Sequence, residues 1–159
     1  MFKSPSYNQL IEFYGNCLAK DFESKNIIAF VPPYQLKYNG NPVKTIRIHK
    51  KISEPVQQIL ESVLNHYGKL EISNLKLDMY SGAYCAPRLM RNGTKLSVHS
   101  YGAALDFCAE LNTLTMKKDK ALFAKPEYDF WNKTWKDFGA FSLGVEKNYD
   151  FMHYQFCLP

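Results

Sequence analysis

One segment of this chain, the run SVHSYGAALD at Ser97–Asp106, restricts its possible folds more than any other. It places His99 and Asp106 seven residues apart, which in a fully extended chain is a distance of roughly 23 Å. Both side chains can belong to one site only if the backbone reverses direction between them. Gly102 is the residue best suited to such a reversal, and the two alanines after it let the returning segment lie close to its neighbour.

This histidine and this carboxylate are two candidate ligands for a metal ion, and a third candidate occurs much later in the sequence. In the run Asp150–His153, a second histidine follows an acid by three residues. Two imidazoles and one carboxylate suit zinc with its fourth tetrahedral position open for water, whose pKa zinc lowers to about 7. Asp150 would then be the general base. For the first motif, the alternative is a hydrogen-bonded His–Asp pair without a metal.

The two motifs resemble those of a known family. The order S-x-H-x-x-G-x-A-x-D, followed far downstream by D-x-M-H, resembles the zinc peptidases of bacterial peptidoglycan. These are D-alanyl-D-alanine carboxypeptidases, D-Ala-D-Ala dipeptidases and the L-alanyl-D-glutamate endopeptidases that phages use as endolysins. The segment Tyr80–Gly93 also resembles the arginine-bearing segment before the family's zinc motif. The resemblance covers about residues 40 to 157, and we expect residues 1–39 to form an N-terminal extension packed on the same single domain.

The resemblance assigns a role to each polar residue of the two motifs. It implies that His99, Asp106 and His153 bind one zinc ion per chain, and that Asp150 is the catalytic acid and base. The last motif departs from the family pattern in one respect, because Tyr154-Gln155 replaces the commoner Phe-Glu or Phe-Gln.

The resemblance also implies a set of substrate-binding residues. Arg88 would hold the substrate carbonyl or carboxylate, as a planar guanidinium does well, and Arg91 on the same segment is the competing candidate. Ser97 and Tyr84 would line the same site. Many family members carry a Trp-Gly-Gly run before the last motif, whereas this chain has Phe141–Lys147 there, so one wall of the substrate pocket is expected to differ.

The implied function is a zinc-dependent peptidase that hydrolyses the peptidoglycan stem peptide. Either a D-Ala-D-Ala carboxypeptidase or an L-Ala-D-Glu endopeptidase fits, with phage or prophage cell-wall lysis as the expected role. One alternative is a non-catalytic, zinc-containing cell-wall-binding protein of the same fold, which would have no need of Asp150. The other is a cysteine peptidase that uses Cys85, which alkylation of the thiol would inhibit and chelators would not.

Charge and hydropathy limit the partners of the chain. Its net charge of +5 favours an anionic partner. The sequence contains no run of five basic residues, which argues against nucleic acid as that partner. Neither a signal peptide nor an apolar run of membrane-spanning length is visible. We expect a monomer that is made in the cytoplasm without membrane insertion. By likeness to endolysins, it would act on the cell wall after holin-type release.

The four cysteines are scattered without any C-x-x-C spacing, which predicts reduced and mostly buried thiols rather than disulfides. Cys108 and Cys157 each lie within four residues of a proposed ligand. A structural zinc site of two thiols and two imidazoles is therefore an alternative to the His–Asp–His site.

The hydrophobic periodicity predicts an α+β fold: a small, mainly antiparallel sheet with helices packed on one side. The zinc site that the resemblance implies is expected on the open face of this sheet. The ligands are expected on strands. Tyr128, Trp131, Trp135 and Phe138 share a helical face that could pack on the sheet or form a stacking platform for sugars. Helices are expected over 7–18, 53–68 and 126–139. Strands are expected over 27–31, 43–49, 70–79 with a break at 73–74, and 152–156. Strand or turn segments are expected over 96–99 and 103–107, and a long loop over 111–123.

Overall fold

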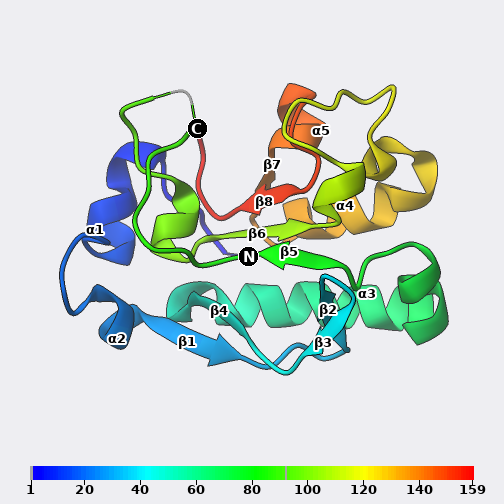
Figure 1. Cartoon of the computed structure of the whole chain (residues 1–159), viewed down its shortest axis with the longest axis horizontal. Coiled ribbons are helices and arrows are strands. Elements are labelled where there is room, and N and C mark those ends of the chain that lie inside the picture. Colours follow the sequence, from blue (N-terminus) through cyan, green and yellow to red (C-terminus); the bar gives the residue numbers. More distant parts are fainter. Residues whose placement is uncertain (1, 92) are drawn as a thin grey trace.

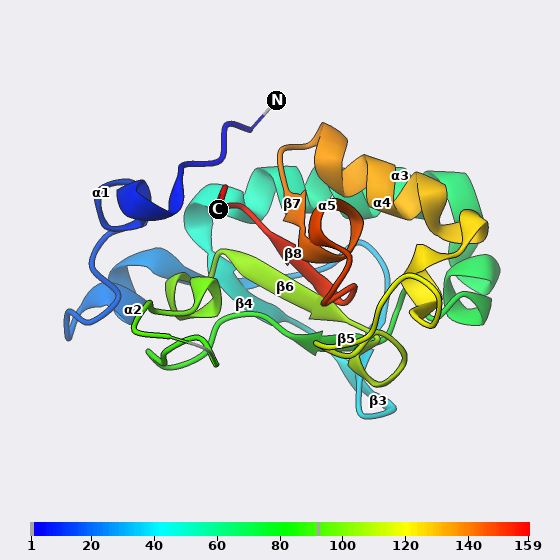
Figure 2. The ribbon, with the colours of Figure 1, turned by 90° about the horizontal axis from the view of Figure 1, so that it is seen from above.

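A computed structural model describes residues 2–91 and 93–159 of the chain. The protein has an α+β fold built from antiparallel sheets and helices. Met1 and Asn92 lie outside the described residues, and Asn92 belongs to the predicted arginine-bearing segment. Helices α3 and α4 lie against each other along one side of the molecule (Figures 1 and 2). The fold class is therefore confirmed at this level, although the described strands form three sheets rather than one.

The central sheet has four antiparallel strands in the order β5-β6-β8-β7. Strand β8, red in Figure 1, pairs with β6 so that His153 lies opposite Asp106 and Tyr154 lies opposite Leu105. Because side chains alternate along a strand, these two pairs point to opposite faces of the sheet. The bounds of the four strands are Tyr80–Gly82 (β5), Ala104–Phe107 (β6), Phe141–Ser142 (β7) and His153–Gln155 (β8).

Helix α4 (Asp129–Asp137) covers the apolar face of this sheet. Trp131 and Trp135 are fully buried. The ring of Trp135 stacks on Tyr154 with centroids 4.8 Å apart, and Trp131 meets Phe107 edge to face at 5.1 Å. The indole N–H of Trp131 donates to the Tyr154 hydroxyl at 2.7 Å. The predicted aromatic face thus packs on the sheet, and its tryptophans have no free ring face for a sugar.

The longest helical element, α3 (Ser53–Asn74), consists of two helical segments that meet at a kink at Gly68. Gly68 has non-helical backbone angles (φ 73°, ψ 163°), so the first segment ends there as predicted, and a second segment that was not predicted follows it. The expected strand over 70–79 is wrong: Leu70–Asn74 are helical, residues 75–78 form a turn, and only Met79 pairs, in an isolated bridge with Lys37. Two apolar residues, Leu70 and Ile72, carried the prediction for its first half, and so short an alternation does not separate a strand from a helix turn.

Two further sheets lie on the side of β5 that is away from β6. Strands β1 (Ile27–Phe30) and β4 (Ile46–His49) form one antiparallel pair, while β2 (Leu36–Tyr38) and β3 (Asn41–Val43) form a hairpin. The strand expected over 43–49 is therefore divided between two sheets. Positive φ angles of 48° at Asn39 and 79° at Gly40 give the hairpin the turn that such strand pairs favour.

The N-terminal segment packs against the segment that follows β8. It contains a 3₁₀ turn (Tyr7–Gln9) and the short helices α1 (Leu10–Tyr14) and α2 (Phe22–Asn26). The helix expected over 7–18 stops early because Gly15 adopts a φ of 94°. The Tyr14 hydroxyl donates to the backbone carbonyl of Phe156 at 2.7 Å, so this segment holds the end of the central sheet.

The remaining structure consists of short turns and helix α5 (Leu143–Lys147). The expected loop over 111–123 has no strand or α-helix. His99 lies on a 3₁₀ turn, which agrees with the strand or turn expected over 96–99 but not with the expectation that every ligand lies on a strand. Asp106 and His153 lie on strands as expected. No helix among the described residues combines the length and the hydropathy needed to cross a bilayer. Other 3₁₀ turns span Lys50–Ile52, Val98–Tyr101, Ala109–Leu111, Leu122–Ala124 and Pro126–Tyr128.

Candidate metal centre

Three predicted ligands from three different elements come together on the polar face of the central sheet. His99, Asp106 and His153 each offer one ligand atom, and these atoms all lie within 4.8 Å of one another. The two carboxylate oxygens of Asp106 divide between the rings: Oδ1 is 2.9 Å from His153 Nδ1 and Oδ2 is 3.2 Å from His99 Nε2. The predicted convergence is confirmed, and the group could hold a metal ion.

The backbone reversal that brings His99 to Asp106 depends on two neighbouring residues. The hydroxyl of Ser97 accepts a hydrogen bond from the backbone N–H of His99 at 3.3 Å and so begins the turn. Gly102 ends it in the left-handed region, with φ 66°. A Cβ atom at Gly102 would lie 2.6 Å from Ile27 Cδ1 and 2.8 Å from the backbone nitrogen of His49. Only glycine fits both requirements, which explains why this position carries the reversal.

The outer nitrogen of each ring faces an acceptor, and the inner nitrogens face the place of the metal. His99 Nδ1 lies 2.6 Å from the carbonyl oxygen of Ala83, which can only accept, so Nδ1 carries a hydrogen. His153 Nε2 lies 3.0 Å from Gln155 Oε1. The inner nitrogens, His99 Nε2 and His153 Nδ1, are 3.2 Å apart, and each lies within hydrogen-bond distance of an oxygen of Asp106. A metal ion among these atoms would replace the hydrogens that the carboxylate otherwise attracts, so the donor set fits a bound metal ion.

The charges at the site agree with this arrangement. Burial alone would raise the pKa of Asp106, but the nearby rings of His99 and His153 outweigh it and hold that pKa well below its usual range. For His153, burial lowers the pKa, and the hydrogen bond and charge of Asp106 raise it above its ordinary value. Asp106 is thus an anion at neutral pH, and the centre attracts positive charge.

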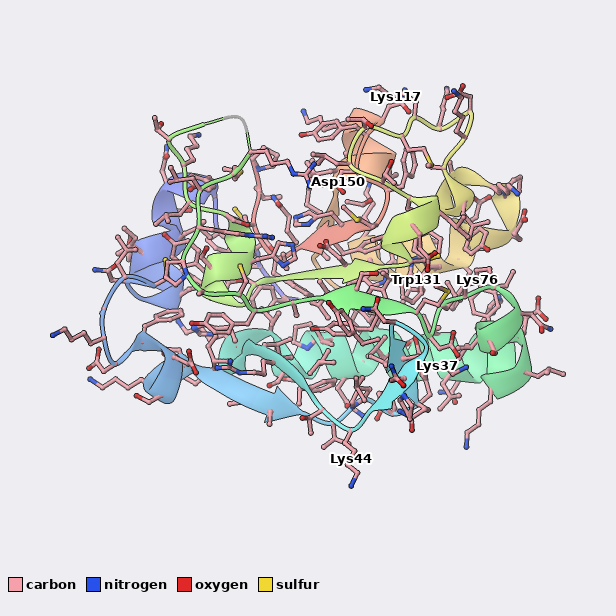
Figure 3. All side chains as sticks on the ribbon, viewed as in Figure 1. Lys37, Lys44, Lys76, Lys117, Trp131 and Asp150 are labelled. Atoms are coloured by element: carbon pink, nitrogen blue, oxygen red, sulfur yellow. The ribbon has the colours of Figure 1, made fainter. Side chains whose placement is uncertain are left out.

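Asp150 lies beside the three ligands with an unsatisfied oxygen. Asp150 is 6% exposed, and its carboxylate oxygen Oδ1 is buried without a hydrogen-bond partner among the described residues. Burial raises its pKa, and the backbone carbonyl of Asp150 accepts a hydrogen bond from the N–H of His153 at 3.1 Å. Figure 3 shows Asp150 above the central sheet, on the side away from Lys44. A buried carboxylate oxygen is costly without a partner, which suggests that a ligand or substrate supplies one.

The two candidate arginines differ in their surroundings. The positive charge of Arg91 acts on Asp150 and partly opposes the rise in its pKa. The backbone of Arg88 is fixed instead: its N–H donates to Ser100 Oγ at 3.0 Å, and its carbonyl accepts from Ser97 N–H at 2.8 Å. Both side chains are exposed. The surroundings of Asp150 thus favour Arg91 as the arginine that faces the centre.

The other two predicted substrate residues have partners within the protein. Ser97 is buried and caps the turn of His99. The Tyr84 hydroxyl donates to Glu23 Oε2 at 3.2 Å, and the guanidinium of Arg47 lies 4.8 Å from the centroid of its ring. These contacts give Ser97 a role in shaping the metal turn and direct the Tyr84 hydroxyl toward α2.

The cysteines do not join this group. All four are free, and among the described residues the candidate metal group contains no thiol. Burial raises the pKa of Cys108 to about 11 and that of Cys157 to about 12, so both are protonated at neutral pH and poor ligands. Cys85 is half-buried, and its backbone N–H donates to the carbonyl of His99 at 3.2 Å. The alternative site of two thiols and two imidazoles therefore has no support in the geometry.

Two groups that orient the rings were not predicted from the sequence. These are the carbonyl of Ala83 and the side chain of Gln155. A backbone carbonyl leaves no signal in the sequence, but Gln155 follows His153 by two residues on a strand, a spacing that places both side chains on one face.

Comparisons with known proteins return nothing: no protein-family model, no curated protein and no solved structure matches this chain.

Proposed function

We propose that this protein is a zinc-dependent peptidase that acts on the stem peptide of peptidoglycan. The observation that carries the proposal is the meeting of two imidazole nitrogens and the Asp106 carboxylate beside a second buried carboxylate, Asp150, which has an oxygen without a partner among the described residues. Three ligands and an adjacent acid are the parts that metal-assisted hydrolysis of a peptide bond needs.

The metal would be held by His99 Nε2, His153 Nδ1 and the carboxylate of Asp106. Two nitrogen donors and one oxygen donor favour zinc over the hard cations, which prefer oxygen ligands alone. When bound, zinc would act as a Lewis acid on the scissile carbonyl and would lower the pKa of a water molecule toward neutral pH.

Asp150 acts as the general base and acid in this proposal. The pKa of Asp150 is raised toward neutral pH. A group that must first accept a proton and later donate it works best when its pKa lies near the working pH. The carboxylate takes a proton from the attacking water and passes it to the leaving amine. Its position directly before β8 holds it beside His153 throughout.

Arg91 binds the substrate in this proposal, with Arg88 as the alternative. A guanidinium can donate two hydrogen bonds to a carboxylate or stabilise the charge that develops on a carbonyl oxygen. The stem peptide carries carboxylates, and the net charge of +5 favours its approach. Peptidoglycan is chosen as the substrate because the motifs resemble those of its zinc peptidases.

The test is to incubate purified peptidoglycan with the protein and to identify the products by mass spectrometry. Parallel samples contain a chelator, or the chelator followed by added zinc. We expect zinc-dependent products: free D-alanine from a carboxypeptidase, or new amino-terminal D-glutamate from an L-Ala-D-Glu endopeptidase. Products that persist in chelator and disappear on thiol alkylation would indicate Cys85 instead. Binding without any product would contradict the peptidase and favour a non-catalytic wall binder.

A further inference from the structure

Gln155 links a proposed metal ligand to the backbone beyond it. It is 7% exposed and lies on β8 two residues after His153, so both side chains share the polar face of the sheet. Its amide nitrogen donates to the backbone carbonyl of Cys157 at 2.8 Å, and its amide oxygen lies 3.0 Å from His153 Nε2. The side chain uses both ends of its amide within the protein.

The carbonyl of Cys157 determines which end of the amide faces the histidine. A carbonyl oxygen can only accept, so the end of Gln155 that faces Cys157 must be the NH₂ group. The oxygen then faces His153, where it accepts a hydrogen from Nε2. The Nδ1 of the same ring lies 2.9 Å from Asp106 Oδ1 and 3.2 Å from His99 Nε2, so without a metal the Asp106 carboxylate competes with Gln155 for the hydrogen of a neutral ring. A metal ion on Nδ1 requires that nitrogen to be free of hydrogen, and the Nε2–H then needs the acceptor that Gln155 provides.

We propose that Gln155 is a positioning residue that stabilises the tautomer of His153 whose Nδ1 is free to bind the metal, and that does so without adding a negative charge. This inference rests on the proposed metal centre and deepens it. With two neutral imidazoles and one carboxylate, a divalent ion in the centre would keep a net positive charge.

The neutral amide distinguishes this position from a carboxylate of the same shape. A glutamate could accept the same hydrogen bond from His153, but its charge would draw the ring hydrogen toward itself and make the imidazole a stronger donor. That change would favour metal binding and weaken the metal as an electrophile. Gln155 thus exchanges some metal affinity for a more electrophilic centre.

The experiment measures tautomer and zinc affinity separately, and neither readout depends on activity. In metal-free protein under mildly alkaline conditions, long-range ¹⁵N–¹H NMR reports which nitrogen of His153 carries hydrogen. We expect a larger Nε2–H fraction in the wild type than in Gln155→Met, where only Asp106 attracts the hydrogen of the ring. Competition with a chelator should show zinc affinity about 10–100-fold weaker in Gln155→Met, the usual cost of losing such a partner. Gln155→Glu should bind zinc at least as tightly as the wild type.

The control is Thr134→Val on α4. It removes another buried hydrogen bond, from Thr134 Oγ1 to the carbonyl of Phe130 at 2.7 Å, on the side of the sheet opposite the ligands. Its zinc affinity should equal that of the wild type, which separates a loss of stability from a loss of ligand orientation.

The outcomes distinguish this inference from the proposed function. An Nε2–H fraction no larger in the wild type than in Gln155→Met, or equal zinc affinity in the two proteins, would overturn the role of Gln155. If the wild type itself binds no zinc, the metal centre fails. Should Gln155→Met not fold, Gln155→Glu still decides, because an Nε2–H fraction below that of the wild type, or loss of zinc, in Gln155→Glu would contradict the inference.

Discussion

The two faces of the central sheet use the same strands for opposite purposes. On one face, Leu105 and Tyr154 form a cross-strand pair that packs under Trp131 and Trp135. On the other, the pair of Asp106 and His153 is adjacent to the pair of Ala104 and Gln155 and faces the candidate metal centre. The apolar face supplies free energy of folding, and the polar face supplies fixed ligand geometry. A rigid apolar layer one residue away is what holds the ligands of the polar layer in place.

The largest expected effect of breaking the polar face comes from His153→Ala. Loss of one of three ligands should weaken zinc binding by more than about 100-fold, beyond the range seen for residues that only orient ligands, and should abolish activity. Zinc content after dialysis and chelator competition measure it. His66→Ala is the control, because that exposed ring stacks on Phe130 away from the centre. Zinc retained by His153→Ala would remove this histidine from the ligand set.

The next effect separates the base from the ligands. Asp150→Asn should lower turnover by about 10²–10⁴-fold, the usual contribution of general acid–base catalysis, while zinc content stays that of the wild type. Turnover on peptidoglycan fragments and zinc content are measured on the same sample. Asp129→Asn, an exposed acid on α4, should change neither. Equal zinc loss in Asp150→Asn and His153→Ala would show that Asp150 is a ligand.

The apolar face should respond in the opposite way. Trp135→Ala should lower the free energy of unfolding by about 3–5 kcal/mol, as large cavities in a core do, with no change in zinc affinity of the folded protein. Urea denaturation measures the loss. Trp135→Phe should lower the free energy of unfolding by less than Trp135→Ala does, because no hydrogen bond is lost: the indole N–H has no partner among the described residues. A change in zinc affinity in Trp135→Phe would show that the two faces are coupled.

A smaller effect is expected at the rim of the polar face. Arg91→Ala should lower kcat/KM by about 10–100-fold, the worth of a hydrogen bond to a charged group, and should leave zinc content unchanged. Arg88→Ala is the matched comparison on the same segment. The opposite order, with the larger loss in Arg88→Ala, would move the substrate role to Arg88.

The smallest effect concerns pH and the metal-free protein. The pKa of Asp106 is lowered in the folded state, so its contribution to stability is present above its ordinary pKa of about 4 and is lost as pH falls through the lowered value. The raised pKa of Asp150 acts with the opposite sign and offsets part of that loss. The raised pKa of His153 also stabilises the fold as pH falls, but this contribution is complete below its ordinary pKa of about 6.5. Urea midpoints should therefore fall as the pH is lowered below about 4, and fall less in Asp106→Asn. A wild-type midpoint that rises below that pH would contradict this.

Much of the candidate site could be predicted because its signals are local. The order of small and polar residues from Ser97 to Asp106 indicated a reversal at Gly102, and the left-handed φ of 66° there confirms it. The helix over 126–139 was predicted from aromatic spacing, and α4 lies within that range. In both cases neighbouring residues alone determine the outcome.

The rest depended on contacts between distant parts of the chain. Leu70–Asn74 read as a strand, because two alternating apolar residues cannot show that Ile72 packs as part of a helix. The outward tautomers of the two rings depend on Ala83 and Gln155, which become partners only after folding. The identity of the metal and of the substrate stays a prediction.

The separation of the ligands along the chain has a consequence for the unfolded state. The side chains of Asp106 and His153 are in contact although the two residues are 47 positions apart in the sequence, and the stretch between them includes α4 and β7. A cation held between them would close this stretch into a loop and so reduce the conformational entropy of any partly unfolded chain, as a cross-link does. Metal binding would then slow local opening of α4, a helix that lies on the far side of the sheet and touches none of the ligands.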